Sequence, residues 1–298
     1  MITDIPTKED FYSSGMDYAM MAYTNILDMV LLLEEFNYDS DDAEAEEYWE
    51  SGRGKLKSSA SLLHQGIDFL LKSKVADISP LLLIENNPDR FPKLDRTGKV
   101  AYSEFYTQDS AKLPKIYNTF CSPPLSDRFL ELYNRSRTRR NKIMHTIDNR
   151  LSIQIKEILR ESIELILNFS QDTWVDLRQE FLDESPEYKL MYEDRVIKER
   201  LQSEFGVLKD FLNNEDFKNV YGIEKRRRFY LCPDCCHPDY VSSPIPTAYL
   251  EPNSPRSTNI FCVICKNSFY VRRDRCAETG CPSNVILIDT DECGVCGH

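Results

Sequence analysis

A histidine follows an arginine and an asparagine at a spacing that could support cleavage of RNA without a metal ion. The three residues are Arg140, Asn141 and His145. Attack of a ribose 2′-hydroxyl on the neighbouring phosphate needs a base, an acid, and a cation that meets the charge building on phosphorus. Histidine suits both proton transfers, because its ordinary pKa of ~6.5 leaves both forms populated near neutrality. Arginine suits the third task, because its planar fork of donors stays charged and matches phosphate oxygens.

These residues lie on one predicted helix, Asp127–Asn149, in which apolar residues recur at helical spacing. On this helix Arg137, Asn141 and His145 follow one another at intervals of four residues and share a face. Arg140 and His145 are five residues apart, which is about 140° around an unbroken helix. One straight helix therefore does not bring them together. Either the helix breaks there, or two copies of the chain build a shared site across a two-fold axis, and we favour the second arrangement.

The same residues resemble a motif of the HEPN family, helical proteins whose ribonuclease members carry Arg-(Asn/Asp/His)-x-x-x-His. The motif falls on Arg140, Asn141 and His145. Residues 61–72 also resemble the second long helix of that family, and the resemblance spans residues 10–172. It implies that His145 is the general acid or base, that Arg140 stabilises the phosphorane, and that Asn141 orients the phosphate or the histidine. It further implies cleavage without a catalytic metal, leaving 2′,3′-cyclic phosphate and 5′-hydroxyl ends.

The resemblance also implies a biological setting. Roles typical of the family are those of toxins or of phage defence, acting on tRNA or messenger RNA, and some of its toxins are controlled by a regulatory protein partner. With the two-fold arrangement favoured above, we expect a homodimer. Two alternatives stay open from the residues alone. The chain could be a binder whose helical body dimerises and whose C-terminal module recognises nucleic acid or protein, or it could be a purely structural adaptor.

Charge is distributed unevenly along the chain. The net charge of −12 argues against a general nucleic-acid binder, but residues 222–298 hold nine basic and nine acidic residues, so the whole excess lies in residues 1–221. Within that acidic part, residues 128–142 carry one acidic residue, Glu131, and six basic ones: Arg128, Arg135, Arg137, Arg139, Arg140 and Lys142. We interpret this run as a positive island and predict that Arg137, Arg139 and Lys142 contact RNA. Because Arg139 adjoins Arg140, the sequence leaves open which of the two is catalytic.

Nine of the ten cysteines follow residue 231, and eight of them form four closely spaced pairs. The pairs are Cys232 with Cys235, Cys262 with Cys265, Cys276 with Cys281, and Cys293 with Cys296. A tight turn carrying two thiolates supplies half of a tetrahedral zinc site, so four pairs predict two structural Zn²⁺ ions. Disulfides would require an oxidising compartment, which nothing else in the sequence indicates. We favour sequential pairing of the four turns over an interleaved cross-brace, and we take Cys236, His237 and His298 as bystanders.

The segments between the cysteine pairs predict short strands. Residues 261–264 and 269–272 are rich in β-branched and aromatic side chains and are expected to form a hairpin. Arg272 and Arg273, beside Tyr270, offer charge and a stacking surface for RNA. Docking of another protein is an equal alternative for this module.

The fold class predicted from these patterns is mainly α, with a HEPN-like helical bundle followed by a small zinc-ribbon β module. The predicted domains are a helical domain over residues 1–175, a helical connector over 176–228, and a double zinc ribbon over 229–298. Apolar spacing predicts further helices over residues 13–36, 55–75, 151–170 and 186–213.

The remaining segments are less regular. The acidic run Asp39–Glu47 is expected to be a solvated loop or the start of a helix, and the proline-punctuated residues 77–122 are expected to form loops with short helices. No apolar run approaches the ~18–20 residues of a membrane span. Residues 1–10 lack a signal-peptide pattern, so we expect a cytoplasmic protein without a membrane partner.

Overall fold

The computed structural model describes residues 1–36, 43–145, 154–190, 194–236 and 244–298. Within these ranges the chain is mainly helical, with ten α-helices and a small C-terminal sheet beside two groups of cysteines. The described residues divide into two compact units, residues 1–170 and residues 171–298. None of the described helices combines the length and the apolarity needed to cross a membrane.

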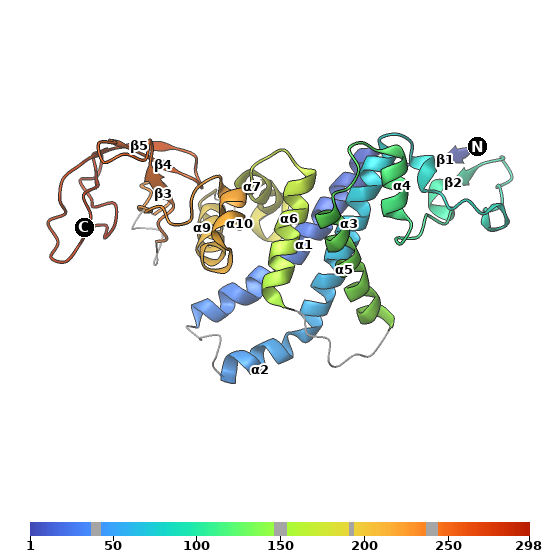
Figure 1. The fold of residues 1–298 in the computed structure, drawn as a ribbon, viewed down its shortest axis with the longest axis horizontal. Helices are drawn as coiled ribbons and strands as arrows, with labels where there is room; N and C mark the ends of the chain where they lie inside the picture. The colour runs from blue at the N-terminus through green and yellow to red at the C-terminus, as the bar shows by residue number, and fades with distance from the viewer. Residues whose placement is uncertain (37–42, 146–153, 191–193, 237–243) are drawn as a thin grey trace. The chain divides into compact units, whose positions relative to one another are not determined.

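Four long helices build the first unit: α1 (Lys8–Glu35), α3 (Arg53–Ala76), α5 (Asp127–His145) and α6 (Ile155–Phe169), which pack lengthwise (Figure 1). Their buried faces are mostly aliphatic, as the apolar spacing requires.

The closest approach in the first unit is between α1 and α3, and two glycines permit it. A Cβ atom on Gly15 would lie 2.7 Å from Cγ of Leu70 on α3. A Cβ atom on Gly66 would lie 2.9 Å from the carbonyl oxygen of Gly15. Any larger side chain at these positions would push the two helices apart, so α3 is held tightly at the point where its other face meets α5.

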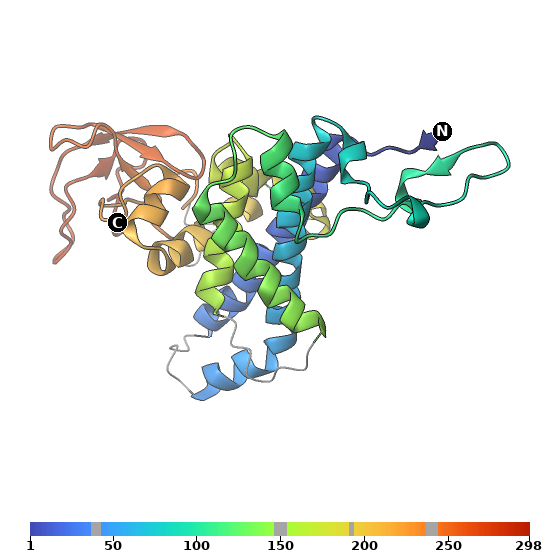
Figure 2. The same cartoon turned by 45° about the vertical axis from the view of Figure 1, so that its right-hand side comes forward.

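Shorter elements surround this bundle. They are α2 (Ala43–Ser51), α4 (Leu113–Phe120), three 3₁₀ turns (Pro80–Leu83, Pro88–Arg90 and Tyr102–Glu104), and the parallel pair β1 (Ile2–Thr3) with β2 (Val100–Ala101). The segment that leaves α3 and returns through β2 to α4 lies at one end of the bundle (Figure 2). Two of its 3₁₀ turns begin at a proline, where the missing N–H group costs nothing. Of the acidic run predicted as a loop or helix start, residues 43–47 begin α2, and residues 39–42 lie outside the described residues.

Helix α5 runs antiparallel to α3 along the bundle. Near the end of α3, the Sγ atom of Cys121 donates to the carbonyl oxygen of Lys74 over 3.5 Å, just before α5 begins. Further along α5, the hydroxyl of Tyr133 bonds to Asp68, which lies earlier in α3. α5 is continuous from Asp127 to His145, so the predicted alternative of a break between Arg140 and His145 is wrong. Residues 146–149 of the predicted helix lie outside the described residues.

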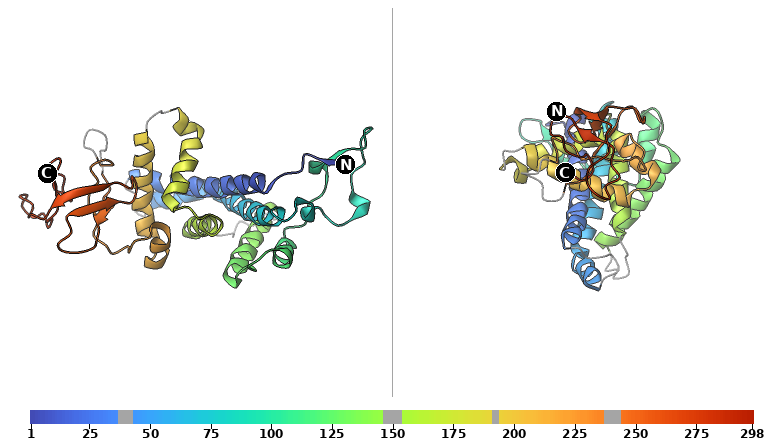
Figure 3. Two further views of the ribbon diagram at one scale, coloured as in Figure 1. Left: turned by 90° about the horizontal axis from the view of Figure 1, so that it is seen from above. Right: turned by 90° about the vertical axis from the view of Figure 1, so that its left-hand side faces the viewer.

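The second unit joins four helices to a four-stranded antiparallel sheet in the order β3-β4-β5-β6 (Figure 3). The helices are α7 (Trp174–Glu184), α8 (Pro186–Lys189), α9 (Asp194–Phe211) and α10 (Asn214–Tyr221). The strands are β3 (Ala248–Leu250), β4 (Asn259–Cys262), β5 (Ser268–Arg272) and β6 (Ile286–Leu287). The predicted hairpin is present as β4 and β5.

Aromatic side chains join the helices of the second unit to its cysteine-bearing part. The ring centroid of Phe205 on α9 lies 5.2 Å from the ring centroid of Phe229 and 5.5 Å from that of Phe217 on α10. Phe229 immediately precedes Tyr230, whose backbone pairs with Ala248 of β3. The helices that we expected to form a connector over residues 176–228 therefore share a core with the sheet.

Two helices of the second unit were not predicted. Both are short, so apolar periodicity is weak, and their caps define them instead. Thr173 accepts a hydrogen bond from the backbone N–H of Asp176 at the start of α7, and Asn213 does the same for Asp216 at the start of α10. α10 ends at Gly222, whose φ of 72° is the left-handed conformation that glycine adopts without strain.

Candidate functional site

Glutamates of α6 neutralise part of the basic run on α5. Arg139 is only 8% exposed, and its guanidinium donates to Glu161 over 2.8 Å and to Glu157 over 3.1 Å. Arg135 reaches the same Glu161 carboxylate over 2.6 Å. In the same way Arg128 pairs with Glu164 at 2.6 Å. Arg139, which we predicted to contact RNA, is thus placed between two helices and not at the surface.

Arg137 and Arg140 differ from these arginines, because neither forms an ion pair with a described residue. Arg140 is half-buried and donates to the side-chain oxygen of Asn141 over 3.1 Å. His145 is exposed at the last residue of α5, and Lys142 is exposed one turn earlier. Of the two neighbouring arginines, Arg140 is therefore the one whose charge is available to a ligand.

Helical geometry gives the directions in which these side chains leave α5. Tyr133 marks the direction of α3, because its hydroxyl bonds to Asp68 on that helix. At 100° per residue, Arg140 lies about 20° to one side of Tyr133 and Arg137 about 40° to the other. His145 lies about 120° from Tyr133 and so turns away from α3. The structure brings Arg137 and Arg140 to the face shared with α3 but does not bring His145 there.

A network of buried polar side chains lies on α3 opposite these arginines. Nε2 of His64 is 3.1 Å from the hydroxyl oxygen of Ser110, and that hydroxyl donates to Asp68 over 2.9 Å. The hydroxyl of Tyr133 donates to the same carboxylate oxygen over 2.8 Å. The other oxygen of Asp68 pairs with Lys72 at 3.3 Å. We use the name α3–α5 seam for the polar residues that face each other here. They are His64, Asp68 and Lys72 on α3, Tyr133, Arg137 and Arg140 on α5, and Ser110.

Three polar atoms in or beside this seam are buried without a hydrogen-bond partner among the described residues. They are Nδ1 of His64, Oγ of Ser136 and Nε of Arg137. Burial lowers the pKa of His64 to about 4, and the charges of Arg140 and Arg137 add to this effect while Asp68 opposes it. The imidazole is therefore neutral at pH 7. Unsatisfied buried polar groups are few in native proteins, so their concentration here marks the seam as unusual.

Sequence reasoning missed His64 as a functional residue. A signal for it was present, because His64, Asp68 and Lys72 follow one another at intervals of four in residues 61–72, where most of the other residues are apolar. All three are at most 9% exposed. A line of ionisable residues on the buried face of a helix needs polar partners from elsewhere in the fold.

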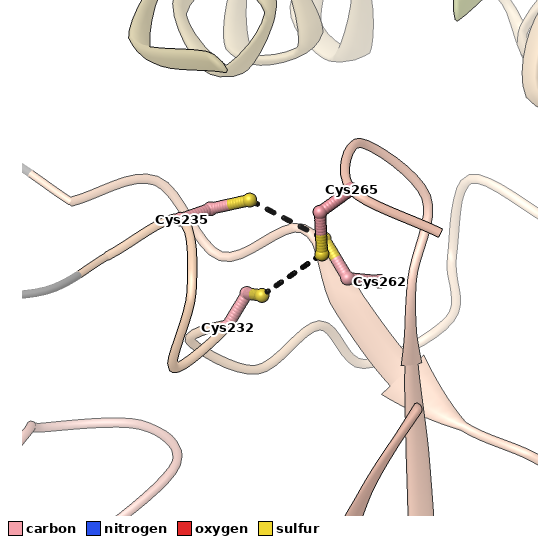
Figure 4. A group of neighbouring side chains, drawn as sticks. All are labelled: Cys232, Cys235, Cys262 and Cys265. Carbon is pink, nitrogen blue, oxygen red and sulfur yellow. Dashed lines mark hydrogen bonds between the residues drawn. The ribbon is translucent and has the colours of Figure 1, made fainter. Parts of the chain in front are cut away.

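In the second unit, eight cysteines form two groups of four. One group is Cys232, Cys235, Cys262 and Cys265, and the other is Cys276, Cys281, Cys293 and Cys296. Figure 4 shows the first group, where Cys262 lies at the end of β4 and Cys265 on the turn that follows. The grouping follows the sequential order that we favoured over a cross-brace. None of the ten cysteines forms a disulfide bond.

The spacing of the sulfur atoms fits a tetrahedral metal ion. In the first group the Sγ atoms are 3.6 Å apart between Cys232 and Cys265, and 3.9 Å apart between Cys235 and Cys262. The corresponding distances in the second group are 3.6 and 3.7 Å. Four thiolates at ~2.3 Å from a central ion would lie about 3.8 Å apart. With four protein ligands each, both groups are consistent with structural metal sites.

The surroundings of the first group hold its ligands in place. The side-chain amide of Gln202 on α9 donates to the carbonyl oxygen of Cys235 over 2.7 Å, and the Thr247 hydroxyl lies 3.3 Å from Sγ of Cys262. Cys236 is not a member of the group: its thiol donates to the other end of the Gln202 amide over 3.3 Å. His237 lies outside the described residues.

The two arginines of β5 and its following turn are engaged within the module. Arg272 pairs with Asp274 and with Asp291, each at 2.6 Å. Arg273 donates to the backbone of Ser257 and to the side chain of Asn284. A contact of Arg272 and Arg273 with RNA stays a prediction, and it would require these bonds to be exchanged.

Neither a family model, nor a curated protein, nor a solved structure matches this chain. The function is therefore argued from the residues and from the geometry of the α3–α5 seam and the cysteine groups.

Proposed function

We propose that the chain is a metal-independent endoribonuclease of the HEPN type. Arg140 stabilises the charge that develops on the scissile phosphate, Asn141 orients that phosphate, and His145 transfers a proton. One observation carries the proposal: Arg140 forms no ion pair with a residue that the structure describes and bonds to Asn141, whereas the adjacent Arg139 is buried against two glutamates. Arg137 and Lys142 are the proposed phosphate contacts beside it.

The active form that we propose is a homodimer. Because α5 is unbroken, Arg140 and His145 diverge by about 140° and cannot both face one phosphate from a single chain. A two-fold axis near the end of α5 would combine Arg140 of one protomer with His145 of the other. Tetrahedral coordination by four cysteines suits Zn²⁺, so we assign two structural zinc ions to the second unit.

The substrate and setting rest on the resemblance of the motif to its family. We propose tRNA or messenger RNA as the substrate and a toxin or antiviral defence role in the cytoplasm. Selective binding is supported by the charge distribution, since an acidic body with a few available arginines favours a docked phosphate over loose binding to any polyanion.

The test is incubation of the purified chain with total RNA and tRNA in EDTA, followed by identification of the fragment ends. Cyclic phosphates and 5′-hydroxyls that disappear in His145→Ala and Arg140→Ala would support the proposal. Met144→Ala is the matched control, because Met144 is also exposed on the last turn of α5 and has no proposed role. Cleavage that persists in His145→Ala would overturn the mechanism, and the absence of cleavage by any form would favour a non-catalytic binder.

The dimer has a separate test. Mixing inactive Arg140→Ala protein with inactive His145→Ala protein produces mixed dimers in which one of the two sites keeps both residues. Random exchange of subunits should restore about a quarter of the wild-type activity. No restoration, with subunit exchange verified, would show that Arg140 and His145 act within one chain.

A further inference from the structure

Cleavage through the 2′-hydroxyl needs two proton transfers, and His145 supplies one group for them. The chain has four histidines. Of the two others that the structure describes, His298 lies in the second unit, and His64 lies in the first unit opposite the arginines of the proposed site. His64 is therefore the residue to consider as the second proton-transfer group.

The register of the two helices places His64 beside Arg137. Tyr133 meets Asp68, and the helices run antiparallel. One turn forward from Tyr133 on α5 is Arg137, and one turn back from Asp68 on α3 is His64. Arg140, nearly in line with Tyr133, follows one turn later. The face of α5 that carries Arg137 and Arg140 is therefore opposite His64 of α3, whereas His145 points to a different side of α5.

The hydrogen-bond network around Ser110 accommodates a proton on Nε2 of His64. The Ser110 hydroxyl donates to Asp68 over 2.9 Å, and the Tyr133 hydroxyl has Asp68 at 2.8 Å and the Ser110 carbonyl oxygen at 2.6 Å as acceptors. With the Ser110 proton directed to Asp68, we assign the His64 proton to Nε2, which then donates to the Ser110 oxygen. This leaves Nδ1 with a lone pair and no donor, which agrees with its lack of a partner. A histidine held through one nitrogen with the other free has the arrangement of a general base.

We propose that His64 is a second catalytic histidine, which accepts the 2′-hydroxyl proton at Nδ1 from RNA whose phosphate is bound by Arg137 and Arg140. The inference rests on the proposed ribonuclease function. In the resulting site, one protomer contributes His64 as the base together with Arg140, and the other protomer contributes His145 as the acid.

The step balances without an external reactant. The 2′-O–H proton passes to Nδ1 of His64 while the 2′-oxygen forms a bond to phosphorus. The bond from phosphorus to the 5′-oxygen breaks, and that oxygen takes a proton from the protonated His145. The products are a 2′,3′-cyclic phosphate and a 5′-hydroxyl, and solvent returns both histidines to their starting forms.

Binding of the substrate would raise the pKa of His64 and so make it a stronger base. The His64 residue is 4% exposed without RNA, so side chains around it must move to admit the ribose hydroxyl when RNA binds. The same event places a negative charge against Arg140 and Arg137, two of the charges that hold the pKa of His64 down. The remaining charged neighbours, Asp68 and Lys72, stay paired. The base would therefore strengthen when a phosphate occupies the seam.

The experiment separates base from acid with an RNA whose 5′-leaving oxygen is replaced by sulfur. A thiolate leaves without protonation, so this substrate needs a base but no acid. We expect His145→Ala to cleave it within about tenfold of the wild-type rate, and His64→Gln to lose about 10²- to 10⁴-fold on both substrates. Glutamine keeps an N–H group for Ser110 but cannot accept the proton. Imidazole added to His64→Ala should restore cleavage, which a structural role for His64 would not allow.

A second measurement does not depend on a variant that folds. On the sulfur substrate, the wild-type rate should fall at acidic pH with one apparent pKa, between about 4 and the ordinary histidine value of ~6.5. A rate independent of pH over this range, or a folded His64→Gln that cleaves both substrates at the wild-type rate, would overturn the inference. If either of these results is obtained while the wild type still cleaves ordinary RNA in EDTA and still requires His145, the proposed ribonuclease function stands and only the role of His64 is rejected. If the wild type cleaves neither substrate, the proposed function itself fails.

Discussion

The two cysteine groups and the α3–α5 seam differ in how completely their polar atoms are bonded within the protein. In each cysteine group the four sulfurs lie within 4.8 Å of one another, and hydrogen bonds from Gln202 and Thr247 support the first group. In the seam, Asp68 is fully bonded, but His64 and Arg137 each keep a buried atom without a described partner. The first region has no ligand position left open, whereas the second has both a lone pair and a donor available.

This difference separates structure from chemistry. A site with all four positions filled by protein contributes to folding and leaves no place for a substrate. A site with unsatisfied polar groups costs stability and persists where a ligand completes it. Changes to the cysteines should therefore affect folding, and changes to His64 and Arg140 should affect reaction with RNA more than folding.

The largest expected effect is loss of a metal ligand. Cys262→Ser should abolish one of two bound zinc ions and unfold the sheet of the second unit, because such sites contribute about 10–16 kcal/mol of metal affinity to folding. Metal content by elemental measurement and hydrogen exchange of β3 to β5 would report this. Cys236→Ser is the matched control and should retain both ions, since Cys236 bonds only to Gln202 and to the backbone of Ile245. A Cys262→Ser protein that holds two ions would contradict the assignment.

The next largest effect is expected from replacing Arg139 by methionine, and the same replacement of the neighbouring Arg140 should have a different result. Arg139→Met should lower the free energy of unfolding by about 3–5 kcal/mol, because it leaves Glu161, 3% exposed, with one cation fewer. Arg140→Met should change that free energy by less than about 0.5 kcal/mol but reduce cleavage about 10²- to 10³-fold. Urea unfolding and RNA cleavage of the two proteins decide this. Equal stability of both would show that the Arg139 ion pairs contribute nothing.

These examples also show which features the sequence could reveal. The cysteine groups depend on pairs a few residues apart, so local spacing predicted the ligand turns and their sequential grouping. Arg139 and Arg140 are identical in type, and the glutamates that separate them come from α6, 18 and 22 residues beyond Arg139. His64 meets Ser110 across 46 residues and Asp68 meets Tyr133 across 65. Such pairings depend on how α3, α5 and the intervening loop fold together, and helical periodicity does not contain them.

Acid should destabilise the seam in a defined range of pH. The pKa of His64 is about 4 in the folded chain and ~6.5 in the unfolded chain, so the unfolded state binds more protons between these values. The free energy of unfolding therefore rises with pH across this window. The contribution of neutral His64 is complete above pH ~6.5 and decreases by up to about 3 kcal/mol as the pH falls to 4. His64→Gln should remove this part of the pH dependence, measured by urea unfolding at pH 4 to 7. An unchanged slope in the variant would show that other groups cause it.

The smallest effect should come from removing one hydroxyl of the seam. Tyr133→Phe deletes the phenol that donates to Asp68 over 2.8 Å, while Ser110 and Lys72 continue to satisfy that carboxylate. We expect a loss of about 1–2 kcal/mol in the free energy of unfolding. Cleavage should fall by less than about tenfold, because the Ser110 bond still orients His64. Ser110→Ala removes that bond instead and should affect cleavage more than stability. If Tyr133→Phe proved the more damaging to cleavage, the proton of His64 would be oriented through the phenol and not through the serine.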